Sequence, residues 1–283
     1  MEAINSTRPL ENMENWRLIL HPPYPAAWNM AVDEAILEST VNRDCLPTLR
    51  LYRWHPYAIS LGRTQKFAEV DLPAVTAHGW DVVRRPTGGK AILHADELTY
   101  SICAPQEDIH VSGNILVSYR LLSKGLLKGL QLAGIAADSR PSEEKNRERL
   151  IDPVCFQYPS DYEITFGGKK LIGSAQARLH KGVLQHGAIP LYGDITRIIE
   201  VLLYDSEEER KAAINNLRAH ATTIAKCIGT LPTWEHMARC MIDGFSQALD
   251  LHFEPAQLSA AEKFRASQLW KEKYANDQWT QRI

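Results

Sequence analysis

The stretch Val82 to Ser101, VVRRPTGGKAILHADELTYS, places a Thr-Gly-Gly turn with two arginines, a lysine and a histidine between short apolar segments. Glycine lets main-chain N–H groups approach a ligand with no side chain in between, which suits an anion or a carbonyl oxygen. The flanks Asp81-Val82-Val83 and Ala91-Ile92-Leu93 favour strands, so we expect a sheet to hold the turn. Taken alone, the motif is equally typical of an exposed Gly-Gly hairpin.

Composition places the chain among globular proteins. Its 283 residues, 45% of them hydrophobic, suffice for one large domain or two small ones. A formal net charge of -2, without a dense Lys/Arg run, disfavours nucleic-acid binding through a general basic field. No apolar stretch reaches the roughly 20 residues of a membrane span, and the polar start has no signal-peptide core. We therefore expect a cytoplasmic protein with no membrane partner.

The order of the expected elements predicts an α+β fold, with strands first and helices later. The expected strands are Trp16–Leu20, Tyr57–Gly62, Glu97–Cys103, Tyr162–Phe166, Lys170–Ile172 and Val183–Leu191. The expected helices are Ala26–Glu38, Val70–His78, Asn114–Ala133, Ile195–Leu203, Glu207–Leu217, Trp234–Leu249 and Ser259–Tyr274. The charged segment Asp138–Asp152 is expected to be a surface loop, with a solvated helix as the alternative, and Gly167-Gly168 is expected to form the turn of a hairpin.

The helix expected at Ala26–Glu38 has an amphipathic pattern, which predicts packing on a sheet. Its apolar residues fall near one face: Met30, Ala31, Ile36 and Leu37. Its acidic residues fall on the opposite face: Asp33, Glu34 and Glu38.

Five cysteines without a CxxC pair disfavour both a disulfide framework and a zinc site, so no metal is expected. Cys155 lies between two prolines in PVCFQYPSDYE, where a thiol can face solvent and act as a nucleophile; the alternative is a structural residue. A nearby cation would stabilise its thiolate, and Lys170 at the start of KLIGSAQAR is the candidate. Lys169 and Lys170 alternate faces if the segment is extended, so only one can enter a pocket; a pair of surface lysines is the alternative.

His94 and His186 are candidate proton carriers, because imidazole titrates near neutral pH. Neither has a sequence neighbour that fixes its role, and a buried histidine bonded to the backbone is the more common explanation of each when it is taken alone. The chain has no HxH or HExxH metal spacing, no Walker loop, no GxGxxG after a strand and no GxSxG elbow.

Three motifs together resemble the core of the lipoate-protein ligase, octanoyltransferase and biotin-ligase superfamily. They are RRPTGGKAILH, KLIGSAQAR and LQHGAIPL, preceded by the family-like helix WNMAVDEAIL, and the resemblance covers Trp16 to Leu251. It implies a mixed, mostly antiparallel sheet with flanking helices, as in biotin/lipoate ligase-like (class II aminoacyl-tRNA synthetase-like) catalytic domains. We expect a flexible leader at 1–15, the catalytic domain at 16–251 and a helical extension packed on it at 252–283.

The segment PVCFQYPSDYE resembles the SVCF-type segment of the cysteine-dependent octanoyltransferases. That resemblance implies that Cys155 forms the acyl thioester, that Lys170 lowers its pKa, and that no cofactor is needed. It also implies a set of substrate-binding residues: Arg85, Thr87, Gly88, Gly89, His94, Gly173, Ser174, Ala175, Gln176, His186 and Gly187. Family members commonly read His-Asp after the glycine turn, whereas this chain reads His94-Ala95-Asp96, so we expect Asp96 to orient His94 from a shifted position.

The implied reaction moves an octanoyl group from octanoyl-acyl carrier protein to a lysine of a lipoyl-accepting protein, such as the glycine cleavage H protein or an E2 lipoyl domain. Backbone N–H groups at Gly88-Gly89 or Gly173-Ser174 would stabilise the oxyanion. One alternative is an ATP-dependent lipoate-protein ligase, in which Lys170 contacts an acyl-adenylate phosphate and Cys155 is incidental. The other is a catalytically silent acyl-binding or partner-binding protein of the same fold.

Overall fold

The computed structural model describes residues 13–140 and 163–283, and within these ranges a large and a small sheet form the centre of the molecule. The strands of the large sheet, from edge to edge, are β11 (Leu251–Pro255), β1 (Glu14–Leu20), β2 (Thr48–Tyr52), β6 (Glu97–Pro105), β10 (Gly182–Pro190), β9 (Lys169–Leu179), β8 (Glu163–Phe166) and β7 (Asp138–Arg140). The small sheet has the order β4 (Asp81–Arg84), β3 (Ala58–Leu61) and β5 (Ile92–His94). In the large sheet β1 runs parallel to β11 and β2 while the other pairs are antiparallel, which confirms the mixed sheet.

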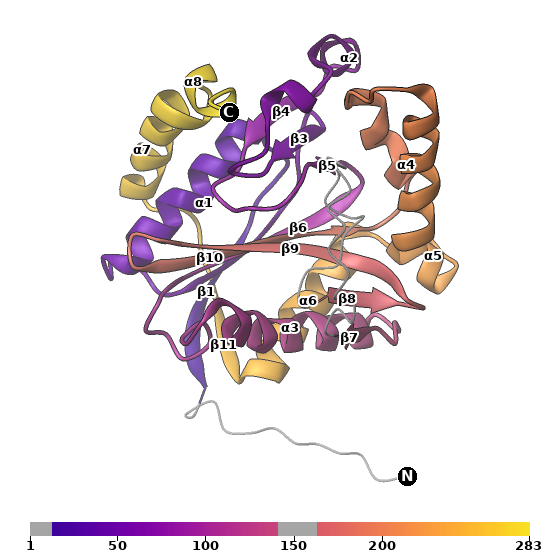
Figure 1. The fold of residues 1–283 in the computed structure, drawn as a ribbon. Helices are drawn as coiled ribbons and strands as arrows, with labels where there is room; N and C mark the ends of the chain where they lie inside the picture. The colour runs from indigo at the N-terminus through magenta and orange to yellow at the C-terminus, as the bar shows by residue number, and fades with distance from the viewer. Residues whose placement is uncertain (1–12, 141–162) are drawn as a thin grey trace, which may run out of the picture.

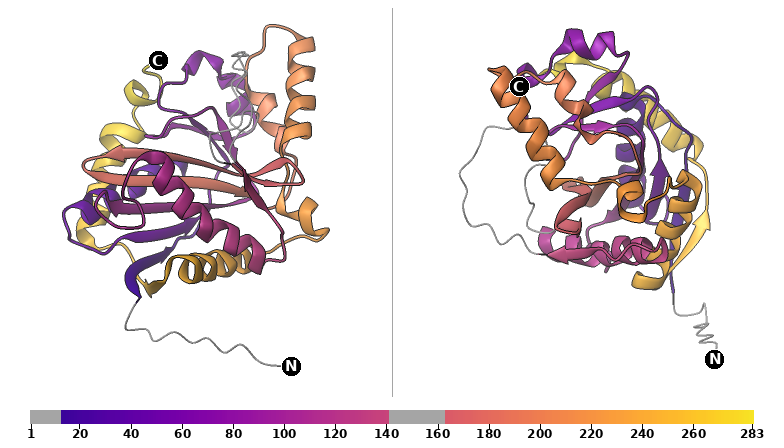
Figure 2. Two further views of the ribbon diagram at one scale, coloured as in Figure 1. Left: turned by 60° about the horizontal axis from the view of Figure 1, so that its bottom comes forward. Right: turned by 90° about the vertical axis from the view of Figure 1, so that its right-hand side faces the viewer.

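Helices cover both faces of the large sheet (Figures 1 and 2). The α-helices are α1 (Ala26–Val41), α2 (Leu72–Ala77), α3 (Ile115–Leu132), α4 (Glu207–His220), α5 (Ile224–Ile228), α6 (Trp234–Leu249), α7 (Ala260–Leu269) and α8 (Asp277–Thr280). Three further segments are helical but not α-helical: the 3-10 helices η2 (Phe67–Glu69) and η4 (Ile195–Val201) and the π-helix η5 (Trp270–Tyr274). Helices α3 and α6 lie on one face; α1 and α7 lie on the other, beside the small sheet and α4.

The contact between α3 and α6 depends on glycine. A Cβ on Gly125 would lie 2.2 Å from the ring of Phe245, and one on Gly244 would lie 2.3 Å from the backbone nitrogen of Gly129. Any larger residue would force the two helices apart. The side chain of Asn114 begins α3 by accepting a hydrogen bond from the Val117 N–H, as expected of an N-cap.

The acidic residues of α1 do not face solvent, so that part of the amphipathic prediction is wrong. Asp33 is 0% exposed and Glu34 is 3% exposed. The carboxylate of Glu34 binds the ammonium group of Lys273 at 2.6 Å and the hydroxyl group of Tyr274. The reason is tertiary: α7 and η5 pack on the side of α1 that turns away from the sheet, so the helix has no solvent face.

A buried network around Asp33 ties α1 to the large sheet. Arg50 Nη1 donates to Asp33 Oδ1 at 2.7 Å, and the hydroxyl groups of Tyr52 and Ser101 donate to the same carboxylate at 2.9 and 2.7 Å. Arg50 Nε donates to His21 Nδ1 at 2.9 Å. Burial favours the protonated acid, but Arg50 outweighs it, and the pKa of Asp33 lies below its usual value.

Several elements differ from their predicted form. The strand β11 was not predicted, because its five residues stand between helices and pair only with the distant β1. The segment predicted as an α-helix at 195–203 is the 3-10 helix η4, and the charged segment from Asp138 begins as the edge strand β7. The rest of that segment and Cys155 lie outside the described residues, and the domain boundaries stay a prediction. No helix in the described ranges combines the length and the apolar character that crossing a bilayer requires.

Removing the charge of Asp33 should destabilise the fold strongly. In Asp33→Asn the guanidinium group of Arg50 stays buried without its counter-charge, and losing one partner of a buried ion pair costs about 3–5 kcal/mol. Urea denaturation of this variant measures the loss. The matched control is Asp44→Asn, at an exposed position, for which we expect no measurable change. A loss below about 1 kcal/mol for Asp33→Asn would contradict the central role of this ion pair.

The same network predicts a pH dependence of stability. Burial, assisted by the charge of Arg50, lowers the pKa of His21 to about 4. The native state then binds a proton less readily than the unfolded chain, so the free energy of unfolding should fall as the pH drops from about 6.5 to 4. His21→Asn keeps an acceptor for Arg50 but cannot titrate, and its slope should be smaller by up to about 1.4 kcal/mol per pH unit. Equal slopes for both proteins in urea titrations would rule out this assignment.

Candidate active site

The small sheet holds the Thr-Gly-Gly turn, as expected, because β4 enters it and β5 leaves it. Arg85, which is 2% exposed, donates to the carbonyl oxygens of Ser60, Gly88 and Lys90 at 2.7 to 2.8 Å. These hydrogen bonds hold the backbone of the turn in one conformation. Among the described residues, the N–H groups of Gly88 and Gly89 donate no hydrogen bond. They can donate to a ligand.

His186 on β10 links this turn to the buried network. Its Nε2 lies 2.7 Å from Thr87 Oγ1, and its Nδ1 lies 3.6 Å from a carboxylate oxygen of Asp33. Burial lowers the pKa of His186, more than the charge of Asp33 raises it, so the ring is neutral near pH 7. The predicted site residues Thr87 and His186, 99 positions apart, are therefore in direct contact.

His94 is oriented by Glu97 and not by Asp96, so that expectation is wrong. Its Nδ1 lies 2.7 Å from Glu97 Oε1, and its Nε2 lies 2.8 Å from Ser60 Oγ. The ring also stacks on Trp54, with 4.0 Å between centroids. Glu97 is the first residue of β6, and the start of that strand directs its side chain back toward the end of β5.

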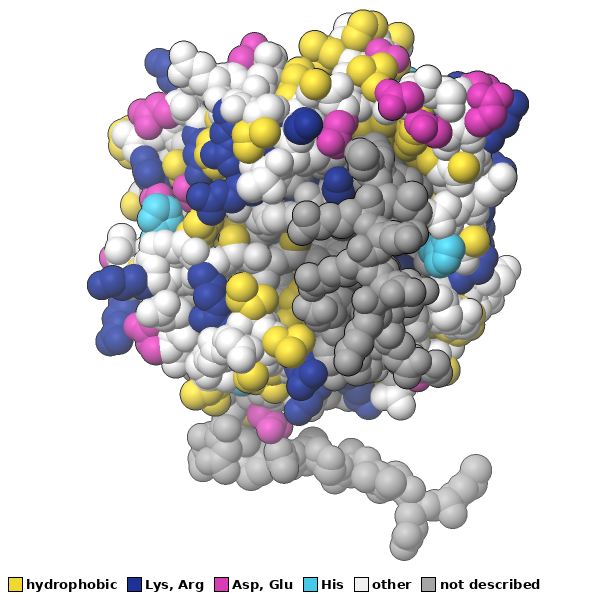
Figure 3. Space-filling model, in the orientation of Figure 1, with side chains coloured by type: hydrophobic (Ala, Val, Ile, Leu, Met, Phe, Trp, Pro, Cys, Tyr) yellow, Lys and Arg dark blue, Asp and Glu magenta, His cyan; other side chains and the backbone are white. Residues whose placement is uncertain are grey.

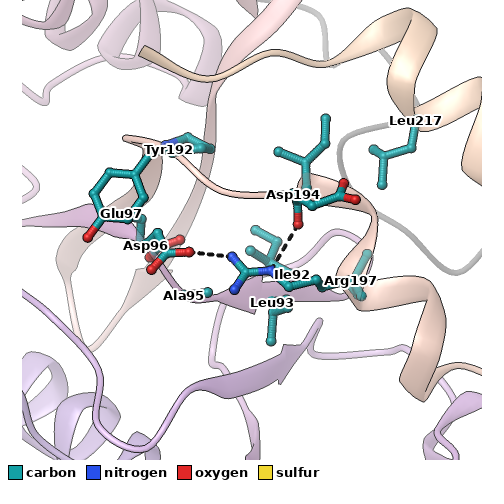
Figure 4. A pocket seen from close by; sticks show the side chains of 12 residues that line it. Ile92, Leu93, Ala95, Asp96, Glu97, Tyr192, Asp194, Arg197 and Leu217 are labelled. Carbon is teal, nitrogen blue, oxygen red and sulfur yellow. Dashed lines mark hydrogen bonds and ion pairs between the residues drawn. The ribbon is translucent and has the colours of Figure 1, made fainter. Parts of the chain in front are cut away.

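Asp96 belongs to a neighbouring pocket (Figure 4). Its carboxylate binds Arg197 Nη2 at 2.6 Å and accepts a hydrogen bond from the Tyr57 hydroxyl group at 2.7 Å. Tyr192 and Leu217 line other regions of this pocket. The Asp96 carboxylate therefore binds Arg197 and Tyr57, whereas His94 Nδ1 is paired with Glu97.

A narrow apolar cavity lies between the glycine turn and strands β9 and β10. It contains about 310 Å³ of space, part of which is open to solvent. Gly173 and Ala175 on β9 and Ala188 on β10 present small side chains to it, while Gly187 makes room on the opposite face, where a Cβ would lie 2.5 Å from the ring of Tyr100. The lining includes apolar residues and six of the predicted binding residues: Met30, Tyr52, Trp54, Ile92, Ala188, Arg85, His94, Gly173, Ala175, His186 and Gly187.

Two predicted binding residues turn their side chains away from this cavity. Ser174 Oγ lies 2.7 Å from the Tyr100 hydroxyl group, and Gln176 Oε1 accepts a hydrogen bond from Ser118 of α3. They alternate with Gly173 and Ala175 along β9, and successive side chains of a strand point to opposite faces. Ser174 and Gln176 thus fasten the strand to the α3 side of the sheet.

Lys170 lies near the start of β9, and it is buried at 5% exposure. Its ammonium nitrogen is 2.6 Å from Glu163 Oε1 on the neighbouring strand β8. Lys169 instead donates to the carbonyl oxygen of Arg218, which confirms that the two lysines face different ways. Gly173 follows three residues after Lys170, or about 10 Å along an extended strand.

The four cysteines within the described ranges are poor nucleophiles. Burial raises the pKa of Cys45, Cys227 and Cys240, and that of Cys103 lies well above its ordinary value for the same reason. A thiol with a raised pKa carries little thiolate at neutral pH. Cys155 lies outside the described residues.

Two groups of histidine and acidic side chains have the spacing of metal ligands: Glu14, Asp108 and His110, and Glu34, Glu38 and His180. Both groups contain ion pairs within the chain. His110 contacts Asp108, while Glu34 binds Lys273 and Glu38 binds Arg265. Local charge pairing accounts for both groups.

Sequence reasoning missed the acidic partners of the site. Asp33 was expected to face solvent, and neither Glu97 nor Glu163 was considered. The three-residue spacing from His94 to Glu97 is a usable signal, because a short turn can bring such residues together. Asp33 carries no comparable signal, since its partners come from distant strands.

Comparison with known proteins agrees with this geometry. The model of the lipoyl protein ligase A/B catalytic domain family matches residues 25–246. The chain belongs to this family. It is 39% identical over 274 residues to the octanoyltransferase LipM of Kyrpidia tusciae, covering 95% of this chain and all of the relative. It is 36% identical over 271 residues to the octanoyltransferase LipM of Bacillus subtilis, covering 94% and 98% of the two chains.

Solved structures of the family share the fold. A bipartite lipoate protein ligase from Thermoplasma acidophilum, studied with its E2 lipoyl domain, matches with a TM-score of 0.78 and 26% identity, over 95% of this chain and 97% of that one. A lipoate-protein ligase A bound with ATP matches with a TM-score of 0.76 and 26% identity, over 95% and 99%. The expected family, the ligase-like fold and the assignment as an acyltransferase enzyme are confirmed.

The orientation of His94 gives a direct test of the site. A carboxylate can only accept, so neutral His94 should carry its proton on Nδ1, facing Glu97. Nitrogen-15 NMR of the imidazole ring distinguishes the two tautomers. Glu97→Ala should remove this preference, and the matched variant Asp96→Ala should keep it. A change of tautomer in Asp96→Ala alone would contradict the assignment.

Proposed function

We propose that this chain is a protein octanoyltransferase of lipoate biosynthesis. It moves an octanoyl group from octanoyl-acyl carrier protein, through a thioester on Cys155, to a lysine of a lipoyl-accepting protein. The acceptor is a glycine cleavage H protein or an E2 lipoyl domain. The cytoplasmic location expected from the sequence stays a prediction.

The observation that carries this proposal is the narrow apolar cavity next to the glycine turn. Arg85, which donates to the carbonyl oxygen of Gly88, lines it on one side, and Gly173 and Gly187 of β9 and β10 line the other. An octanoyl chain is unbranched and apolar, and each buried methylene contributes about 0.8 kcal/mol. The cavity can therefore supply both affinity and selection for chain length. The two full-length relatives from Kyrpidia tusciae and Bacillus subtilis, both named octanoyltransferase, support the choice of acyl group.

The proposed reaction has two acyl transfers. The Cys155 thiolate attacks the donor carbonyl carbon, a new carbon–sulfur bond forms, and the carrier thiolate leaves and takes up a proton. The deprotonated amine of the acceptor lysine then attacks the enzyme thioester, an amide bond forms, and the Cys155 thiolate leaves. The N–H groups of Gly88 and Gly89, which donate no hydrogen bond to another described residue, would stabilise the oxyanion in each step.

Lys170 and the two histidines have separate proposed roles. The buried ammonium group of Lys170 favours the thiolate form of Cys155 by its charge. Neutral His186 holds Thr87 and thereby fixes the adjoining glycines. His94, oriented by Glu97, lines the cavity wall. Because a thioester donor is already activated, the reaction needs no nucleotide.

An ATP-dependent lipoate-protein ligase is the second candidate. It is favoured by the structural match to a ligase bound with ATP. In that reaction Lys170 contacts the phosphate of an acyl-adenylate, and Cys155 has no chemical role. A catalytically silent binding protein of the same fold is the third candidate. It would form no covalent adduct with any donor.

Intact-mass analysis after mixing with octanoyl-acyl carrier protein in the absence of ATP separates these candidates. We expect one octanoyl adduct on the chain, and its transfer to an H protein or lipoyl domain added afterwards. Cys155→Ala should lose the adduct and reduce transfer by at least about 10³-fold, as expected when a covalent nucleophile is removed. A strict requirement for ATP, or full activity of Cys155→Ala, would support the ligase.

Cys227→Ala is the matched control, because burial keeps that thiol protonated. It should form the adduct at the wild-type rate. Lys170→Met should still accept the octanoyl group, but the pH midpoint of adduct formation should rise, since the thiolate loses its neighbouring cation. An unchanged midpoint would remove Lys170 from the mechanism.

A further inference from the structure

A cationic loop packs against the outer side of the glycine turn. The Arg63 N–H donates to the Thr87 carbonyl oxygen at 2.8 Å. The contact at Gly62 is so close that a Cβ there would lie 1.8 Å from the carbonyl oxygen of Gly89. The side chains of Arg63 and Lys66 are exposed, and that of Lys90 in the turn is half-buried. Arg63 and Lys90 therefore border the predicted oxyanion site, and Lys66 lies on the same loop as Arg63.

The C-terminal segment adds a fourth cation to this border. Arg282 donates from Nη2 to the carbonyl oxygen of Arg63 at 2.7 Å, and its guanidinium group lies 3.9 Å from the ring centroid of Trp279. Trp279 is itself anchored to the carbonyl oxygen of Arg84. We name Arg63, Lys66, Lys90 and Arg282 the basic rim. Figure 3 shows Lys and Arg side chains gathered on this face, below the position of the C-terminus in Figure 1.

The positive charge of the basic rim is not neutralised by carboxylates of the described residues. None of its four members forms an ion pair within 13–140 or 163–283. Beneath the rim lies Arg84, which is 0% exposed, and its Nη2 has no hydrogen-bond partner in those ranges. Burial and the charge of Arg282 lower the pKa of Arg84, and burial and Arg63 lower that of Arg282.

The neighbouring carboxylate of Glu69 accepts a hydrogen bond from Gln65 Nε2 at 2.8 Å and forms no ion pair with a rim cation among the described residues. The whole chain has a formal net charge of -2, so the rim is a local positive surface on a slightly acidic protein. Like charges held together with no carboxylate partner in the described ranges favour an anionic partner.

We propose that the basic rim is the docking surface for an acidic face of the acyl carrier protein that delivers the octanoyl group. This inference rests on the proposed function. The donor brings its thioester on an arm that carries a phosphodiester, so negative charge arrives beside the glycine turn. The acceptor instead presents a lysine, whose ammonium group the rim repels. The rim therefore belongs to the donor half of the reaction.

Charge reversal on the rim tests this proposal through a comparison of two donors. In Arg63→Glu/Lys66→Glu, kcat/KM for octanoyl-acyl carrier protein should fall by about ten-fold or more, mainly through KM. The activity of the wild-type protein toward this donor should also fall with added salt. Octanoyl-N-acetylcysteamine is a neutral thioester without the carrier protein or the phosphodiester, and its kcat/KM should not change in the double variant.

Arg239→Glu is the matched control, because Arg239 is an exposed cation on α6, on the other face of the sheet. It should retain wild-type kcat/KM for both donors. Equal loss for the carrier protein and the neutral thioester in the double variant would overturn the proposal, as would a rise in KM for the acceptor alone. If the wild-type protein forms no octanoyl adduct at all, the proposed function fails. If it does and the double variant matches it, only the docking surface fails.

Discussion

The fold depends on one fully buried carboxylate. Asp33 lies on α1, and its partners come from three strands of the large sheet: Arg50 and Tyr52 on β2, Ser101 on β6 and His186 on β10. An isolated buried charge is very unfavourable, so the helix and strands must assemble together for any of these groups to be accommodated. The same carboxylate faces His186, which holds Thr87 of the glycine turn. Folding and site geometry are therefore set by one interaction.

Small residues create the space in which a substrate can bind. Gly173 and Ala175 on β9 and Ala188 on β10 line the cavity with small side chains. Gly187 and Gly62 permit close packing around it: a Cβ on Gly187 would meet the Tyr100 ring, and a Cβ on Gly62 would meet the carbonyl oxygen of Gly89. Each histidine in the wall has a carboxylate partner, and the surface that the lining presents is almost entirely apolar. Such a site suits an uncharged chain that ends in a reactive carbonyl.

This fold suits two reactions, ATP-dependent ligation and acyl transfer, because a fold does not by itself determine the reaction that its site catalyses. In either case, we propose that the cavity binds the acyl chain and that the glycine turn binds its carbonyl group. A ligase must also activate a free acid with a nucleotide, whereas a transferase needs a nucleophile and access for a protein-bound thioester. The buried Lys170 can stabilise a phosphate or a thiolate equally well. The basic rim beside the turn is more closely matched to a protein donor than to a nucleotide held inside the cavity.

Local sequence determined the features of this protein whose causes are local. The glycine turn between two strands, the Gly167-Gly168 hairpin, α3 and the opposite directions of Lys169 and Lys170 follow from glycine conformation and from the periods of strands and helices. The family was also visible, because its motifs lie in these short segments. Only the tertiary structure decided that Asp33 is buried, that Glu97 and not Asp96 orients His94, and that residues 251–255 form an edge strand. A carboxylate looks the same in any sequence, and its role depends on which distant cations, hydroxyl groups and helices the folded chain brings against it.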